Sequence, residues 1–281
     1  MFKYENILSD VNINIGEGKD YLILPTLKNA RWIIELGDYR NKLNSFLIYQ
    51  PSSIRGKIFK CFVIFCPNRL LSLFFKRQLI KLNFKESFID KLFTNSDNSY
   101  SVYLGNGSVH NKATIQLSRK NNPYAYFKFS QNNTVRNLFE NESKILDVLM
   151  NKFNISNIPI VMYHGAVNDL GYFATSSIRT RESKFIDKIK SEHVDFLIKI
   201  YKSTSREKIT YDGLVLLYKS RIKLACNQIP IFKQHEYNFD NILKQCSESE
   251  MKYTLAHKDF TPWNSFFNNE QIYVFDWEYA E

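Results

Sequence analysis

The change of hydrophobic pattern along the chain constrains its fold most strongly. From Val102 to about residue 165, short alternating stretches separated by polar turns predict the strands of a small antiparallel sheet. Residues 134–153 then predict a long amphipathic helix, with Thr134 as candidate N-cap and one apolar face formed by Leu138, Ile145, Leu146 and Leu149. Helical patterns follow from about residue 172, and two short apolar runs around a polar loop come last. This order predicts an α+β fold.

Composition excludes several classes of protein. Of the 281 residues, 44% are hydrophobic and 23% are charged, which fits neither a disordered chain nor a coiled coil. Four Cys are too few for a disulfide framework, and the spacing of Cys61 and Cys66 is not repeated elsewhere, so a zinc site is not expected. The first residues mix acids and amides where a signal peptide needs an apolar stretch, and no run approaches the ~20 apolar residues of a spanning helix. We therefore expect a cytoplasmic protein.

Basic residues are concentrated early in the chain. The formal net charge is +10, and the segment between Asp38 and Glu86 holds ten Lys and Arg without a single acid. Phe and Leu are interleaved with these charges, which predicts basic amphipathic helices that contact an anionic membrane surface through residues 40–91. The alternative is a solvated helix face packed on its own domain. No nucleic-acid motif accompanies the charge, so no nucleic-acid partner is expected.

The residues that could carry chemistry lie near the C-terminal end. Asp259 precedes Asn264 on a loop restrained by Pro262, and Asp276 follows the next apolar run. Mg²⁺ prefers a few oxygen ligands from protein and keeps water or phosphate oxygens otherwise. Asn264 and Asp276 could supply such ligands, and Asp259 could then accept a proton from a hydroxyl. Phosphoryl transfer needs this division of labour.

This motif resembles a known group of enzymes. The run from His257 through Asp259 to Asn264, followed by Asp276 in a Phe-Asp-Trp-Glu run, is similar to the catalytic and metal-binding loops of the aminoglycoside phosphotransferase and choline kinase group, within the protein-kinase-like fold. Lys258 stands where this group commonly has Gly. The resemblance implies ATP and Mg²⁺ as cofactors, Asp259 as catalytic base, Asn264 and Asp276 as metal ligands, and His257 as a loop-stabilising residue.

The same resemblance implies an upstream lysine for the nucleotide phosphates and a glutamate that holds it. Lys128 lies in a predicted strand, and Glu142 follows in the predicted helix, with Glu140 as the rival partner on another helix face. Gly105 and Gly107 begin the first hairpin and would bring backbone N–H groups near the phosphates. Gly-Asn-Gly is also an ordinary hairpin turn, so that alternative stays open.

The resemblance covers about Val102 to Glu281 and implies a two-lobed architecture. We expect an N-terminal α/β extension of unknown role (1–98), a kinase-like N-lobe with a small antiparallel sheet (99–175) and a truncated helical C-lobe (176–281), with a hinge at 173–178 that contacts adenine. Self-association or a second chain would then complete the C-lobe.

The predicted activity is transfer of the γ-phosphoryl group of ATP to a hydroxyl of a small molecule or sugar, for example in cell-surface polysaccharide metabolism at the inner face of the membrane. One alternative is an inactive, truncated kinase-like protein that binds nucleotide. Another is a basic adaptor in which the carboxylates are structural.

Overall fold

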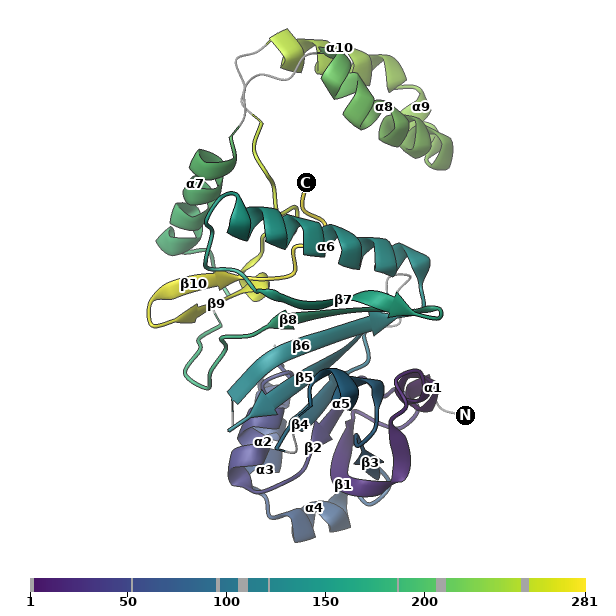
Figure 1. Cartoon of the computed structure of the whole chain (residues 1–281), viewed down its shortest axis with the longest axis vertical. Helices are drawn as coiled ribbons and strands as arrows, with labels where there is room; N and C mark the ends of the chain where they lie inside the picture. Colours follow the sequence, from purple (N-terminus) through teal and green to yellow (C-terminus); the bar gives the residue numbers. More distant parts are fainter. Residues whose placement is uncertain are drawn as a thin grey trace. The chain divides into compact units, whose positions relative to one another are not determined.

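Eight antiparallel strands form one sheet in the order β3-β1-β2-β4-β5-β6-β8-β7 in the computed structural model of the chain (Figure 1). The structure describes residues 3–51, 53–94, 97–105, 111–120, 122–185, 187–205, 211–248 and 253–281. The strands are β1 (Asn14–Leu24), β2 (Trp32–Glu35), β3 (Leu79–Asn83), β4 (Ser99–Tyr103), β5 (Ala113–Arg119), β6 (Asn122–Ser130), β7 (Val161–Val167) and β8 (Leu170–Ser176), and a separate hairpin consists of β9 (Ser265–Asn268) and β10 (Gln271–Val274). The predicted α+β class is confirmed.

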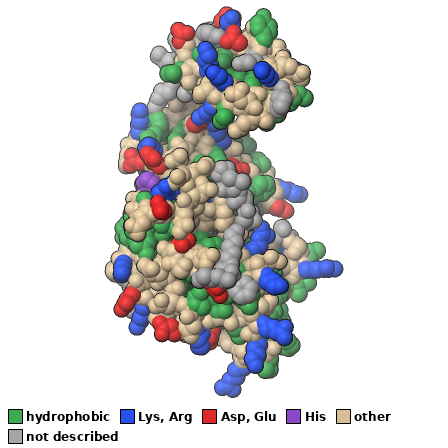
Figure 2. Space-filling model, turned by 90° about the vertical axis from the view of Figure 1, so that its right-hand side faces the viewer, with side chains coloured by type: hydrophobic (Ala, Val, Ile, Leu, Met, Phe, Trp, Pro, Cys, Tyr) green, Lys and Arg blue, Asp and Glu red, His purple; other side chains and the backbone are tan. Residues whose placement is uncertain are grey.

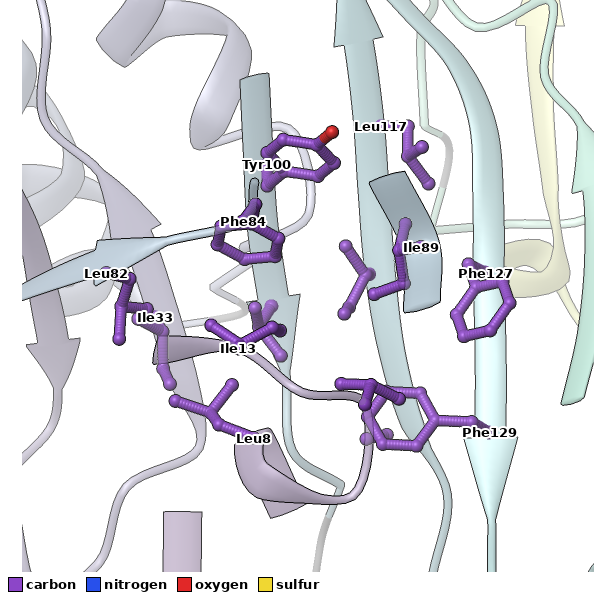
Figure 3. Packing of buried hydrophobic residues seen from close by; sticks show 14 of the residues in the cluster. Leu8, Ile13, Ile33, Leu82, Phe84, Ile89, Tyr100, Leu117, Phe127 and Phe129 are labelled. Atoms are coloured by element: carbon purple, nitrogen blue, oxygen red, sulfur yellow. The ribbon is translucent and has the colours of Figure 1, made fainter. Parts of the chain in front are cut away.

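One face of the sheet carries the larger hydrophobic core. Side chains alternate between the two faces of a strand, so Phe127 and Phe129 of β6 point to this face together with Leu117 of β5 (Figure 3). Leu8 of α1 (Lys3–Ser9) and Ile89 of α5 (Phe88–Leu92) pack onto the same cluster and are fully buried. The two short helices thereby close this face.

Four other helices pack on the opposite face. The register places Leu22 of β1, Gln116 of β5 and Lys128 of β6 on this face, because directly paired residues point the same way. Around β1 and β2 it is covered by α2 (Tyr39–Ser45), α3 (Ile54–Phe65) and α4 (Asn68–Phe74), whereas α6 (Asn133–Asn151) packs on β6, β7 and β8. The part of the sheet between these two groups of helices holds the candidate site.

The N-terminal segment contributes strands as well as helices. The predicted boundary between residues 98 and 99 falls inside one continuous sheet, since β1, β2 and β3 precede it and β4 follows it. The prediction of helix was wrong for the end of the basic stretch, where residues 79–83 form β3 and pair with β1. Ile80 and Leu82 belong to a period-two pattern there, which long-range pairing with β1 stabilises.

Contacts divide the chain into two compact units. Unit 1 comprises residues 1–189 and 259–280, and unit 2 comprises residues 190–258 with Glu281. Unit 2 is helical, with α7 (Ser191–Thr204), α8 (Tyr211–Gln228), α9 (Pro230–Lys233) and α10 (Glu236–Glu248). Among the described helices, none combines the length and the apolar character needed to cross a bilayer.

The core of unit 1 makes a prediction about two phenylalanines. Phe93 is buried, with its ring 6.4 Å from that of Phe127, whereas Phe62 of α3 is 44% exposed. Phe93→Ala is expected to lower the free energy of unfolding by about 3–5 kcal/mol, because it opens a cavity in the core. The matched change Phe62→Ala is expected to cost no more than about 1 kcal/mol. Chemical denaturation of both variants measures the difference, and equal losses would contradict the assigned core.

Candidate active site

Lys128 points toward the face of the sheet on which α6 packs, because side chains alternate between the two faces along β6. Ala125, Phe127 and Phe129 are buried on the other face, so Tyr126 and Lys128 point toward α6. The Lys128 Nζ donates to both carboxylate oxygens of Glu142, at 3.1 and 2.8 Å. Lys128 on β6 and Glu142 on α6 are therefore in direct contact.

Glu142 occupies the buried face of α6 and is 1% exposed. The rival Glu140 lies on the solvent side, where it forms an ion pair with Lys144 at 2.6 Å. The N-cap lies two residues before the predicted one: Asn132, rather than Thr134, is the N-cap, and its side chain accepts from the Thr134 backbone N–H at 2.8 Å. The backbone of Asn132 is extended, and its side chain satisfies a backbone donor that the helix leaves unpaired.

Asp276 meets the same lysine from the end of β10. The Lys128 Nζ lies 2.8 Å from the Asp276 Oδ1. Asp276 adopts a left-handed backbone conformation with φ 67°, which Asp tolerates better than most residues. Trp277 is fully buried beside it and donates from Nε1 to the Val274 carbonyl at 3.1 Å, while Asn141 of α6 donates to the Glu278 carbonyl at 3.0 Å. These contacts fix the segment that carries Asp276 against α6.

Two further charged residues complete the cluster, and sequence reasoning missed both. The Lys112 Nζ lies 3.3 Å from the Asp276 Oδ1 and also forms an ion pair with Glu278. A signal was present for each: Lys112 is two residues before Thr114, the register partner of Lys128, and Glu278 is two residues after Asp276. Two lysines therefore face three carboxylates, with Glu142 as the most deeply buried of them.

The electrostatics of this cluster favour the charged forms of Lys128 and Asp276. Burial lowers the pKa of Lys128, but the surrounding carboxylates outweigh burial and raise this pKa above the ordinary lysine value. Burial likewise raises the pKa of Asp276, yet the charges of Lys128 and Lys112 outweigh it and hold this pKa well below its usual range. Burial raises the pKa of Glu142, with Lys128 opposing that shift. The charged forms of Lys128 and Asp276 are thus stabilised by their neighbours, whereas burial disfavours the charged form of Glu142.

The Lys128–Glu142 contact predicts a non-additive stability effect. Lys128→Met leaves the Glu142 carboxylate buried without its lysine, and is expected to lower the free energy of unfolding by about 3–5 kcal/mol. The double variant Lys128→Met/Glu142→Gln removes both charges and is expected to recover most of that loss. Denaturant unfolding of the two single variants and the double variant measures the coupling, and strict additivity would contradict a buried ion pair.

The predicted catalytic loop forms a second group of contacts. The Asn264 Nδ2 donates to the Asp259 Oδ2 at 2.8 Å and to the Asp259 carbonyl at 2.9 Å. Asn264 ends a short 3₁₀ turn (Pro262–Asn264) and is buried, and its carbonyl accepts from the Phe275 N–H at 3.0 Å. That bond joins the loop to the residue before Asp276, so the two groups of predicted site residues share one backbone junction.

Two more residues of the motif, His257 and Lys258, come directly before Asp259. Lys258 adopts a left-handed conformation with φ 63°, a region that glycine enters without steric cost. His257 is buried.

Gly105 has φ +79°, and a Cβ there would lie 2.2 Å from the Asn111 Oδ1, so the start of the predicted first hairpin requires glycine. Gly107 lies outside the described residues.

A cavity of about 260 Å³ connects the charged cluster to an aromatic wall. Lys112, Lys128, Glu142 and Asp276 line its charged end. Residues 175–179 at the end of β8 and Ile48 from the N-terminal segment line part of the remainder. Aromatic side chains line most of the rest: Tyr103, Tyr126, Phe185, Phe266, Tyr273 and Phe275. The predicted hinge at 173–178 therefore reaches the cavity through its last four residues, whereas Phe173 and Ala174 are fully buried in β8. The cavity thus has a mostly aromatic part and a charged end.

Comparison with known proteins finds similarity only at the level of structure. No protein-family model matches the sequence, and no curated protein matches it. The structure is similar to that of the ternary complex of streptomycin, ATP and APH(2″)-IIa, with 17% identity over 69% of each chain and a TM-score of 0.44. It is also similar to the gentamicin complex of APH(2″)-IIa (16% identity, 69% of this chain and 68% of that chain, TM-score 0.45). A third similar structure is the GDP and kanamycin complex of APH(2″)-IIIa (14% identity, 68% of this chain and 71% of that chain, TM-score 0.42). What the site can do follows from its own side chains.

Proposed function

We propose that this chain transfers the γ-phosphoryl group of ATP to a hydroxyl of a small molecule or sugar. One observation carries the proposal: Lys128, held by the buried Glu142, faces Asp276 at the charged end of an aromatic-walled cavity. Because a carboxylate already fixes the lysine side chain, its ammonium group can bind phosphates with little further loss of conformational entropy. The aromatic wall suits a planar base, which places the phosphates of a nucleotide toward Lys128.

The donor set near Asp276 fits a magnesium ion. Carboxylate oxygens of Glu142, Asp276 and Glu278 lie within 4.8 Å of one another, and hard cations prefer oxygen ligands. Asp276 and Asn264 remain the proposed ligands, with Glu278 as an addition that the geometry suggests. When bound, Mg²⁺ neutralises charge on the phosphates and so lowers the barrier to transfer.

The chain's own residues then carry out positioning and proton transfer. The acceptor oxygen attacks the γ-phosphorus as the bond from that phosphorus to the bridging oxygen breaks, and ADP leaves. Asp259 orients the hydroxyl and accepts its proton, and Asn264 holds the Asp259 carboxylate through the 2.8 Å hydrogen bond. Lys128 stays on the phosphates throughout. An ATP-dependent reaction of this kind belongs in the cytoplasm.

Steady-state ADP formation tests the proposal. The purified chain is assayed with ATP against aminoglycosides, choline, homoserine and simple sugars, with and without Mg²⁺, and with Asp259→Asn as the control. The proposal expects Mg²⁺-dependent ADP formation that one acceptor class stimulates. Product identified by mass as a phosphate monoester would support it, and absence of turnover with every acceptor would contradict catalysis.

The contact between Lys112 and Asp276 favours one alternative function. Lys112 competes with a cation for Asp276 and Glu278, so a chain in which this contact persisted would bind nucleotide without transferring phosphate. That alternative expects thermal stabilisation by ATP in the absence of any product. The Lys112→Met variant separates the two, because it would raise the affinity for Mg²⁺ only if Lys112 blocks the site.

A further inference from the structure

An exposed hydrophobic surface covers the outer side of α3 and α4. We name it the α3–α4 surface and define it by seven large apolar side chains of residues 54–74 that are at least 44% exposed: Ile54, Ile58, Phe62 and Phe65 on α3, and Leu70, Leu73 and Phe74 on α4. The rings of Phe62 and Phe74 lie 6.2 Å apart, so the side chains of the two helices form one continuous surface. Contiguous apolar surface of this kind marks an interaction site.

The helix α3 carries more apolar surface than its packing in unit 1 uses. Its inner side packs Phe59, Val63 and Ile64 against the core beneath β1 and β2. Ile54, Ile58 and Phe65 recur at helical spacing on the other side and remain 65–75% exposed. A helix with a single partner needs one apolar stripe, and α3 has two.

Basic residues are interspersed with the apolar residues of this surface along the sequence, and acids are absent from the same stretch. Between Asp38 and Glu86 the sequence contains no Asp or Glu. Figure 2 shows Lys and Arg side chains gathered with hydrophobic ones at the bottom of the view, the end where Figure 1 places α4. Exposed Lys and Arg of this stretch form no ion pair among the described residues: Arg55, Lys57, Arg69, Lys76 and Arg77. The charge complements a polyanionic surface.

The form of the surface distinguishes among polyanionic partners. Its side chains protrude, with Ile54 and Leu73 both 75% exposed, and a protein partner would have to supply the pocket for each of them. A bilayer interface accommodates protruding apolar groups without matched pockets, and its anionic headgroups attract the flanking Lys and Arg. With only 12 residues, α3 is far too short to span a membrane, so it would lie in the interface.

We infer that the α3–α4 surface docks this protein on an anionic lipid bilayer, with its apolar side chains in the interface and its basic side chains on lipid phosphates. The inference is independent of the proposed catalytic activity, because none of these side chains lines the cavity of the candidate active site.

Vesicle co-sedimentation of the full chain tests the docking. The vesicles contain phosphatidylcholine alone or phosphatidylcholine mixed with phosphatidylglycerol. The apolar variant carries Phe65→Ser, Leu73→Ser and Phe74→Ser, and its matched control carries Val148→Ser, Ile160→Ser and Val167→Ser at exposed apolar positions elsewhere. The basic variant carries Arg69→Gln, Lys76→Gln and Arg77→Gln, and its control carries Lys120→Gln, Lys144→Gln and Lys152→Gln.

The native chain and both controls are expected to co-sediment with the mixed vesicles and not with vesicles of phosphatidylcholine alone. The basic variant is expected to partition about 100-fold more weakly, since each Lys or Arg near an anionic surface contributes about fivefold. The partition coefficient of the apolar variant is expected to fall at least about tenfold, because three fewer apolar side chains insert into the bilayer interface.

Three results would overturn the inference. The first is no binding of the native chain to mixed vesicles. The second is equal losses in variants and controls, which would mean adsorption by net charge alone. The third is dimerisation of the native chain, seen by sedimentation equilibrium without vesicles and abolished in the apolar variant, which would make a second copy the occupant.

Discussion

Replacing Asp259 by asparagine is expected to lower kcat by about 10²–10⁴-fold, the usual contribution of a general base. The Asn side chain keeps the shape and still contacts Asn264, but it cannot take the proton of the acceptor hydroxyl. Nucleotide affinity is expected to stay within about twofold, because Asp259 contacts Asn264 rather than the Lys128 cluster, and twofold is under 0.5 kcal/mol.

Steady-state kinetics with the best acceptor, together with calorimetric nucleotide titration, measures both quantities. Asp147→Asn is the matched control, because Asp147 is an exposed carboxylate on α6 that accepts a hydrogen bond from the Asn151 side chain at 2.7 Å. Full turnover in Asp259→Asn would contradict its assignment as the base.

Replacing Asp276 by asparagine is expected to abolish Mg²⁺-dependent nucleotide binding and to lower kcat/KM by about 10³-fold, since metal neutralisation of phosphate contributes several kcal/mol. The variant also removes the carboxylate that Lys128 and Lys112 share. An Asp276→Glu variant keeps the charge and displaces it by one methylene, so it is expected to retain weak metal dependence.

Titration of Mg²⁺ at fixed ATP distinguishes these variants. The native chain is expected to show saturable Mg²⁺ dependence, Asp276→Glu a right-shifted curve and Asp276→Asn a flat one. A native-like Mg²⁺ curve in Asp276→Asn would mean that the ion binds elsewhere, and Glu278 would be the next ligand to replace.

Local pattern explains why part of the site could be predicted from the sequence. Period-two alternation in residues 124–130 indicates a strand and fixes the face of Lys128, and the helical spacing of the following segment brings Glu142 to that same face. Asp276 follows an apolar run that forms β10. Each of these inferences depends on residues close together in the chain.

Long-range pairing explains what could not be predicted. The strand β3 pairs with β1 across about 60 residues, as in the pairing of Tyr21 with Ile80, and no local pattern specifies such a contact. The apolar and basic residues around β3 also match a helix, so the pattern alone was ambiguous. Lys112 was missed for the same reason, because its contact with Asp276 depends on how the hairpin and the C-terminal segment meet in space.

Calorimetric titration of a non-hydrolysable ATP analogue tests the central claim most directly. The native chain and the double variant Lys128→Met/Glu142→Gln are titrated with and without Mg²⁺, after unfolding curves have verified that both are folded. We predict saturable binding to the native chain that strengthens at least about tenfold with Mg²⁺ and is lost in the double variant. Equal binding by both proteins, with no effect of Mg²⁺, would show that the nucleotide phosphates do not lie at Lys128, and would contradict the account.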